Sequence, residues 1–177
     1  PGTYALSAYS PEEVYVRRHI IDHTPDIIVN TVVASNLERN LYLTTELIDI
    51  SPKMVIALNM YDELERSGAK FDHEALGRMI GVPIVPVVAT SGRGIEELLD
   101  RLIAVYENRE QSVRHIHIGY GSIIEEHLKD LNDDMRQHRN ELTAHFPPRY
   151  FALKLIERDK EIVSLLSTAP HFERWSA

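Results

Sequence analysis

Residues 54–62 read Met-Val-Ile-Ala-Leu-Asn-Met-Tyr-Asp, an apolar run that leads directly into polar residues. A nearly continuous apolar run is typical of a strand that is covered on both faces of its sheet. Runs of the same kind occupy residues 27–33 and 84–88, and helical patterns separate the three. Alternating strands and helices favour parallel strands joined by right-handed crossovers. The sequence therefore predicts an open α/β sheet.

Capping residues and apolar spacing predict the helices around this sheet. Ser10-Pro11-Glu12-Glu13 is a capping box with proline at the first helical position, and Ser35 and Glu38 repeat the box. The predicted helix over 95–106 has the cleanest apolar stripe, which includes Leu99, Ile103 and Tyr106. Four helices are thus predicted, at 11–23, from 35 onward, at 72–81 and at 95–106.

The last third of the chain has a different pattern. After a polar connector, apolar residues at helical spacing predict one long helix over 120–142, which ends before Pro147-Pro148. Two shorter helices are predicted over 149–158 and 159–168. A small all-α part therefore follows the sheet.

Composition narrows the class of protein. The chain has 177 residues, of which 44% are hydrophobic and 26% charged, so a packed globular fold is expected. It has no cysteine, which excludes disulfides, thiolate metal sites and a cysteine nucleophile. The formal net charge of −8 disfavours nucleic acid as a partner. No apolar run is long enough for a membrane span, and the chain starts at Pro1 without Met, so we expect a soluble piece of a longer protein.

Polar residues follow two of the predicted strands, where open α/β sheets bind ligands. Asp62 can accept two parallel N–H bonds, and guanine offers that donor pair at N1 and its 2-amino group, whereas adenine does not. Asn59 can support the loop or reach the acceptor edge of the base. Backbone N–H groups of Ala89 to Ser91 can face guanine O6. An Asn-x-x-Asp tetrad alone also fits an ordinary loop, because both residues favour turns.

Longer motifs surround these residues. Five stretches are informative: Pro1-Gly2-Thr3-Tyr4; Ala34-Ser35-Asn36-Leu37-Glu38-Arg39-Asn40-Leu41-Tyr42-Leu43-Thr44; Ala57-Leu58-Asn59-Met60-Tyr61-Asp62; Gly92-Arg93-Gly94-Ile95-Glu96; and Tyr150-Phe151-Ala152-Leu153-Lys154-Leu155-Ile156-Glu157-Arg158-Asp159. The first four resemble the cytoplasmic G domain of the bacterial ferrous iron transport protein B (FeoB) family. The fifth resembles a signature of that family's helical domain.

The resemblance implies an incomplete, Ras-like P-loop GTPase sheet with flanking helices over 1–108, a connector over 109–118 and a helical domain over 119–177. That helical domain would resemble a GDP-dissociation inhibitor, a brake that favours the GDP-bound state. No catalytic or metal-binding residue is predicted. The implied GTP- or GDP-binding residues are Pro1, Gly2, Asn59, Met60, Tyr61, Asp62, Val88, Ala89, Thr90 and Ser91.

The chain departs from the family pattern in several places. The glycine-rich phosphate loop, its lysine, its Mg²⁺-binding hydroxyl and the first switch are not in this sequence. The family resemblance implies Mg²⁺, but the residues that would bind it are not in this sequence. Hydrolysis by the residues present alone is therefore not expected. Val33 stands where the family has aspartate. Gly2 is implied to donate its N–H to the γ-phosphate, and a flexible terminal glycine is the alternative.

For the intact protein, the resemblance implies a GTPase portion that regulates Fe(II) uptake at the cytoplasmic face of the bacterial inner membrane. Its partners would be guanine nucleotide and the protein's own transmembrane channel domain, and a homo-oligomer is compatible with this. The rival hypothesis is a non-catalytic protein-interaction module with the same α/β plus helical-bundle fold.

The last third of the chain carries three further expectations. Apolar spacing predicts that Ile124 and Leu128 face inward, which leaves Glu125 and its polar neighbours to contact the switch segment Thr3 to Ser10. His115 and His117 lie on one side of an extended segment, but two histidines without a predictable third ligand do not make a metal site, and a solvated connector is the favoured interpretation. His127, His138 and His145 are expected on a polar flank of the long helix.

Overall fold

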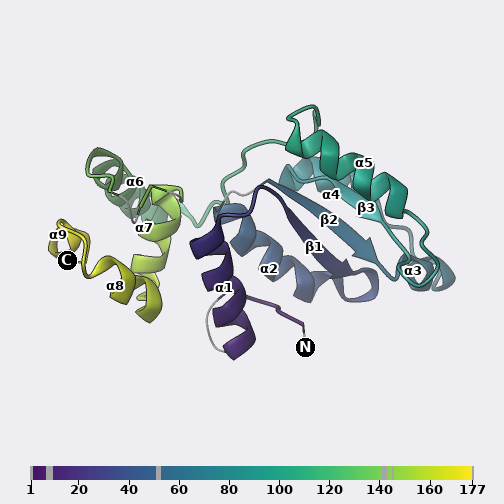
Figure 1. Cartoon of the computed structure of the whole chain (residues 1–177), viewed down its shortest axis with the longest axis horizontal. Helices are drawn as coiled ribbons and strands as arrows, with labels where there is room; N and C mark the ends of the chain where they lie inside the picture. Colours follow the sequence, from purple (N-terminus) through teal and green to yellow (C-terminus); the bar gives the residue numbers. More distant parts are fainter. Residues whose placement is uncertain (1, 7–9, 51–52, 141–142, 145, 177) are drawn as a thin grey trace. The chain divides into compact units, whose positions relative to one another are not determined.

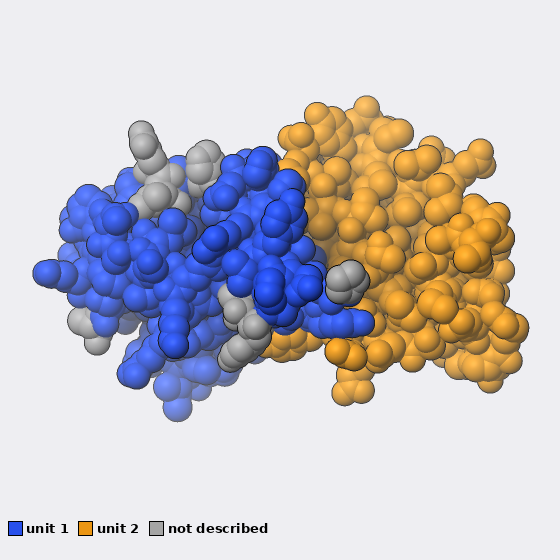
Figure 2. Space-filling view, turned by 60° about the horizontal axis from the view of Figure 1, so that its bottom comes forward, with its two compact units in different colours: residues 1–24, 46–51, 117–177 blue, residues 25–45, 52–116 orange. Residues whose placement is uncertain are grey.

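The computed structural model describes residues 2–6, 10–50, 53–140, 143–144 and 146–176. The chain forms two compact units, which Figure 2 colours separately. We call residues 25–45 and 52–116 the sheet unit, and residues 1–24, 46–51 and 117–177 the helical unit. Residues 1–24 thus belong to the same compact unit as the helices after residue 117. The domain boundaries at 108 and 119 stay a prediction.

Three parallel strands in the order β1-β2-β3 form the centre of the sheet unit (Figure 1): β1 (Ile28–Val33), β2 (Met54–Asn59) and β3 (Ile84–Pro86). Ile28 pairs with Met54 at one end of the β1–β2 ladder, and Val33 pairs with Asn59 at the other. The middle strand is buried throughout its apolar run. The parallel α/β sheet predicted from the sequence is confirmed.

β3 is shorter than predicted. Val87 still donates to Leu58 O, but the N–H of Val88 donates to Arg93 O at 2.9 Å. Val88 has therefore left the sheet and begins a turn, because its ladder position is taken over by a local antiparallel bridge to Arg93.

The sheet unit also contains α3 (Tyr61–Arg66), α4 (His73–Ile80), α5 (Ile95–Tyr106) and most of α2 (Leu37–Ile50). A 3₁₀ turn, η1 (Ala34–Asn36), precedes α2, so Ser35 lies inside this turn and the predicted capping box does not form. Helix α3 was not predicted. A core cluster joins α5 to the sheet through Val55, Ala57, Val85, Val87, Leu98 and Val105.

The apolar stripe of α5 is only partly buried. Leu98 and Val105 pack in the core, whereas Leu99, Ile103 and Tyr106 are each more than half exposed. The sheet therefore covers only one side of the predicted stripe, and the side with Leu99, Ile103 and Tyr106 faces solvent.

The helical unit contains α1 (Pro11–His23), α6 (Ser122–Gln137), α7 (Pro148–Ile156), α8 (Lys160–Leu166) and α9 (Phe172–Trp175). The capping box at α1 is confirmed, since Ser10 Oγ accepts the N–H of Glu13 and the Glu13 carboxylate accepts that of Ser10. Helix α7 packs against both α6 and α8. None of the helices in the described ranges is long and apolar enough to cross a membrane.

Helix α6 ends at Gln137, earlier than predicted. Asn140 and Thr143 exchange hydrogen bonds between their side chains and backbones, with donor–acceptor distances of 3.0 and 3.1 Å. Such short polar side chains offer the backbone an alternative to the helix. Helix α9 was not predicted, and its Trp175 Nε1 donates to Asp134 Oδ2 on α6 at 2.8 Å.

Candidate functional site

Two neighbouring loops of the sheet unit contain eight of the ten predicted site residues. Asn59 ends β2, and its Oδ1 accepts the N–H of Ala89 at 3.1 Å. The backbone N–H of Tyr61 donates to Val87 O at 3.3 Å. These two bonds hold the loops together. The Asn59 side chain therefore supports the loop, which is the first of the two roles predicted for it.

Met60 makes the turn between β2 and α3. Its φ of 58° and ψ of 32° lie in the left-handed region, which is uncommon for a residue with a side chain. The turn places Tyr61 at the start of α3, where its ring meets the His73 ring edge-on with 5.9 Å between the centroids. Asp62 therefore lies in the first turn of α3, directly beyond the end of the middle strand.

The Asp62 carboxylate has a partner on its own helix. Arg66 Nη2 lies 2.5 Å from Asp62 Oδ2, and Arg66 Nε donates to the carbonyl oxygen of Asp62 at 3.2 Å. The side chains are 71% and 37% exposed, respectively, so the carboxylate remains open to solvent. Sequence reasoning missed Arg66, although an acid and a base four residues apart were a readable signal.

The second loop turns tightly after β3. Ser91 donates to Val88 O through both its N–H and its Oγ, at 3.1 and 3.2 Å, while Ala89, Thr90 and Ser91 are exposed. Gly94 has a φ of 80°, and a Cβ there would lie 2.2 Å from Pro86 O, so the turn requires glycine.

An ion pair adds a third connection between the loops. Arg93 Nη2 lies 2.8 Å from Glu65 Oε2, one turn after Asp62 on α3. Glu65 was not singled out from the sequence, and Arg93 was noted only as part of the motif Gly92-Arg93-Gly94-Ile95-Glu96. The two loops thus form one exposed polar cluster at the carboxyl ends of β2 and β3.

The remaining two predicted residues are not in these loops. Pro1 lies outside the described residues. Gly2 is exposed and is part of the helical unit. Its contact with the γ-phosphate stays a prediction.

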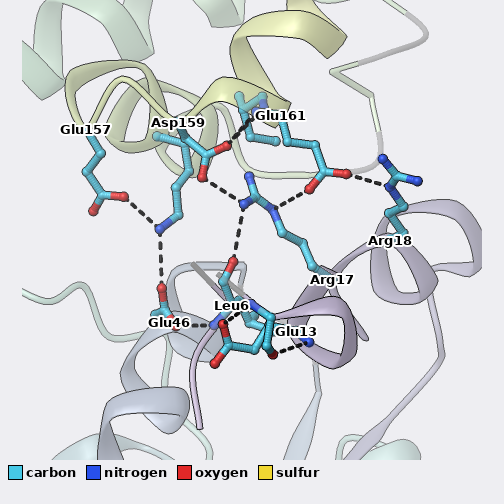
Figure 3. A network of polar contacts seen from close by, with 11 residues as sticks. Leu6, Glu13, Arg17, Arg18, Glu46, Glu157, Asp159 and Glu161 are labelled. Carbon is cyan, nitrogen blue, oxygen red and sulfur yellow. Dashed lines mark hydrogen bonds and ion pairs between the residues drawn. The ribbon is translucent and has the colours of Figure 1, made fainter. Parts of the chain in front are cut away.

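A buried polar network in the helical unit holds the segment that follows Gly2 (Figure 3). The N–H of Leu6 donates to Glu46 Oε2 at 2.5 Å, and the carbonyl oxygen of Leu6 accepts from Arg17 Nη1 at 3.2 Å. All three residues are buried. The backbone at Leu6 is therefore fixed from both sides.

Both side chains that hold Leu6 have partners near the end of the chain. Lys154 Nζ lies 3.4 Å from Glu46 Oε1, and Arg17 Nη1 lies 2.7 Å from Asp159 Oδ2. Burial works against the ionised form of Asp159, yet the hydrogen bonds from Arg17 and the Ile162 N–H lower its pKa below the usual range. From the sequence, Glu125 and its polar neighbours were expected to contact the switch segment.

Glu125 instead has partners within the helical unit. Arg149 makes a bidentate pair with it at 2.8 and 2.9 Å, and this lowers the pKa of Glu125 to about 2. Ile124, predicted to face inward, is 39% exposed, whereas Leu128 is fully buried as predicted.

Tyr120 and Asp49 form a second buried contact in this unit. The Tyr120 hydroxyl donates to Asp49 Oδ2 at 2.5 Å. Burial raises the pKa of Asp49 above its ordinary value despite this hydrogen bond.

Histidine rings meet in two pairs, His19 with His23 at 4.4 Å and His138 with His171 at 4.1 Å between centroids. Within the described ranges, no group of three or more His, Cys, Asp or Glu side chains is arranged to hold a metal ion. His127 and His138 each lie with Nδ1 near the backbone oxygen four residues earlier, at 3.0 and 2.9 Å. His145 lies outside the described residues.

Comparisons with known proteins relate both parts of the chain to one family. The family model described as ferrous iron transport protein B matches residues 1–102. The model described as the FeoB cytosolic helical domain matches residues 120–175. The resemblance noted in the sequence is confirmed.

Individual relatives agree with these matches. The "Fe(2+) transport protein A/Fe(2+) transporter FeoB fusion protein" of Porphyromonas gingivalis is 46% identical over 171 residues, which are 96% of this chain and 20% of that protein. An "Fe(2+) transporter FeoB" of Staphylococcus aureus is 32% identical over 95% of this chain and 24% of its own length. The chain spans about a fifth to a quarter of these curated relatives.

Solved structures share the fold. The apo cytosolic domain of T. maritima FeoB has a TM-score of 0.83 at 26% identity, over 100% of this chain and 65% of that one. A variant of S. thermophilus NFeoB bound to mGDP has a TM-score of 0.84 at 30% identity, over 99% and 65%. Because the first family model covers more than half of the chain and these likenesses agree with it, the chain belongs to the ferrous iron transport protein B family.

Proposed function

We propose that the loops at 59–62 and 88–91 read the guanine base of GTP or GDP in the intact protein. The observation that carries this is the hydrogen bond from the Ala89 N–H to Asn59 Oδ1, which brings the Asp62 carboxylate and the second loop to one edge of the sheet. A preorganised pair of loops suits recognition of a planar base, because little order has to be gained on binding. Related NFeoB structures are described as bound to mGDP and mGMPPNP.

Each group has a distinct task in this proposal. Asp62 accepts the N1–H and 2-amino donors of guanine, and an adenine would leave the carboxylate without them. Asn59 positions the second loop. The N–H groups of Ala89 and Ser91 already donate within the loops, so we assign guanine O6 to the N–H of Thr90.

The phosphates require residues outside this sequence. No Gly-x-x-x-x-Gly-Lys-Ser/Thr motif occurs among the 177 residues, and with it the Mg²⁺-binding hydroxyl is missing. The residues present therefore do not form a Mg²⁺ site, and no catalytic step is assigned to them. Hydrolysis and regulation of Fe(II) uptake at the cytoplasmic face of a bacterial membrane are proposed for the intact protein only.

Calorimetric titration of the intact protein with GDP and ADP tests the proposal. We expect GDP to bind and ADP to bind at least about 100-fold more weakly, because adenine leaves the Asp62 carboxylate without its two donors. Equal affinities, or no binding of either nucleotide, would favour the interaction module.

We further propose that α7 and α8 restrain the segment, within the same unit, that the family resemblance assigns to the second switch. The specific observation is the double contact at Leu6, since Glu46 and Arg17 hold its N–H and carbonyl and are themselves paired with Lys154 and Asp159. A brake needs contacts that differ between nucleotide states, and this backbone position is the candidate.

A further inference from the structure

We infer that Arg66 sets how strictly the site rejects a base that lacks the 2-amino group. The inference rests on the proposed role of Asp62 as the guanine-reading residue. It assigns to Arg66 a positioning and specificity role that neither the family match nor the two base-reading loops require.

Arg66 is fixed on Asp62 by two contacts. Its Nη2 lies 2.5 Å from Asp62 Oδ2, and its Nε donates to the Asp62 carbonyl oxygen at 3.2 Å. Of the other two acids on α3, Glu65 is engaged by Arg93 at 2.8 Å, and Glu63 makes no ion pair with Arg66 among the described residues. The guanidinium is therefore directed at Asp62 rather than shared among the three acids.

Guanine can bind without breaking this pair. An ionised carboxylate offers about four acceptor positions, and Arg66 uses one of them on Oδ2. The remaining positions can accept the N1–H and the 2-amino group together. The ion pair and the base thus share one carboxylate.

Hypoxanthine, the base of inosine nucleotides, keeps the N1–H and lacks the 2-amino group. A carboxylate with no other partner would lose one of its two donors to such a base, and the uncompensated charge is the source of discrimination. Arg66 still donates to Asp62 in that complex. Discrimination between guanine and hypoxanthine is therefore shallower with Arg66 than it would be with an isolated aspartate.

The test is the ratio of dissociation constants for IDP and GDP, measured by calorimetry on the intact protein. We expect Arg66→Ala to raise this ratio roughly two- to fivefold, the scale of an exposed ion pair. Arg66→Lys keeps a cationic donor and should stay closer to the wild-type ratio. The matched control is Arg78→Ala, which removes another exposed i,i+4 pair, with Glu74 on α4, and should leave the ratio unchanged.

Each possible result either supports the inference or overturns it. An unchanged or lowered ratio in Arg66→Ala overturns the inference, and so does an equal weakening of both nucleotides, which would give Arg66 a role in shaping α3 only. Preference for GDP over ADP is measured on the same samples. If that preference is absent from the wild type, the proposed function itself fails, whereas a preserved preference with an unchanged ratio removes only the role of Arg66.

Discussion

Arg17 on α1 has no exposed side-chain surface, and its Nη1 lies 2.7 Å from Asp159 Oδ2 at the start of α8. The two residues are 142 positions apart in the chain. Asp159 Oδ1 also accepts the N–H groups of Glu161 and Ile162, so one carboxylate pairs a buried cation and caps a helix. Breaking a buried pair from one side leaves the other charge uncompensated.

We therefore expect Asp159→Ala to lower the free energy of unfolding by about 3 to 5 kcal/mol, because the buried Arg17 would keep only its longer pair with Glu161, at 3.8 Å. Urea denaturation measures the loss. Asp72→Ala is the matched control, since Asp72 caps α4 by accepting the Ala75 N–H at 2.8 Å but pairs with no buried cation. Its cost should be about 1 kcal/mol. Equal losses would show that the cap, not the ion pair, stabilises the helical unit.

Asp49 should make stability depend on pH in a defined direction. Burial raises the pKa of Asp49 in the folded state, so the folded protein binds its proton more tightly than the unfolded chain does. The stabilisation is complete below the unfolded pKa of about 3.9 and is lost as pH rises through the raised folded pKa.

Asp49→Asn mimics the neutral form and keeps an oxygen for the Tyr120 hydroxyl. We expect the variant to gain stability over wild type at pH 7 and to lose that advantage near pH 4. Thermal unfolding at both pH values measures the difference. A variant that is less stable than wild type at pH 7 would mean that the ionised carboxylate is the stabilising form.

The sheet was predictable because its signal is local. Residues 54–58 are apolar without interruption, and a strand buried on both faces needs no information from elsewhere in the chain. Helix α3 was not predictable from the sequence, because six residues are too few to show a periodic pattern and because Met60 starts the helix from a left-handed backbone conformation.

The polar network around Leu6 was not predictable. Its pairs, Arg17 with Asp159 and Glu46 with Lys154, are 142 and 108 positions apart, and charged residues are normally exposed. The base-reading loops were found through their motif, yet the ion pairs of Asp62 and Glu65 that shape them were overlooked. The four-residue spacing of Asp62 and Arg66 was sufficient to predict the first pair. Glu65 lies on α3 and Arg93 in the turn after β3, so only the fold reveals the second pair.

Base preference in the intact protein should follow Asp62. In Asp62→Asn the amide can donate to the 2-oxo group of xanthine, so we expect preference to change from GDP to XDP. The wrong pairing should cost about 2 to 5 kcal/mol. Competition binding with the two nucleotides measures the exchange. Asp72→Asn, an exposed change that keeps a good cap, is the control, and equal GDP affinity in wild type and Asp62→Asn would remove Asp62 from the site.

Residues 1–177 alone should bind GDP no more tightly than roughly the millimolar level, because the phosphate cradle supplies most of the charge-assisted hydrogen bonds to a nucleotide. Calorimetry on the 177-residue chain measures this directly. Micromolar affinity would contradict the assignment of the phosphates to residues outside the sequence.

The contact at Leu6 gives the proposed brake a specific test. Glu46→Leu removes the acceptor of the Leu6 N–H, whereas Glu46→Gln removes the charge and keeps an oxygen in its place. If the helical unit holds this segment in its GDP-bound arrangement, Glu46→Leu should speed GDP release from the intact protein at least about fivefold, the lower end of typical coupling. Release of GMPPNP should change less, and Glu46→Gln should lie closer to wild type. Stopped-flow fluorescence with mGDP and mGMPPNP measures both rates.

Equal acceleration for the two nucleotides would mean that Glu46 merely stabilises the fold, since a nucleotide effect requires differential contact in the two states. Unchanged rates would mean that Leu6 does not move with nucleotide state.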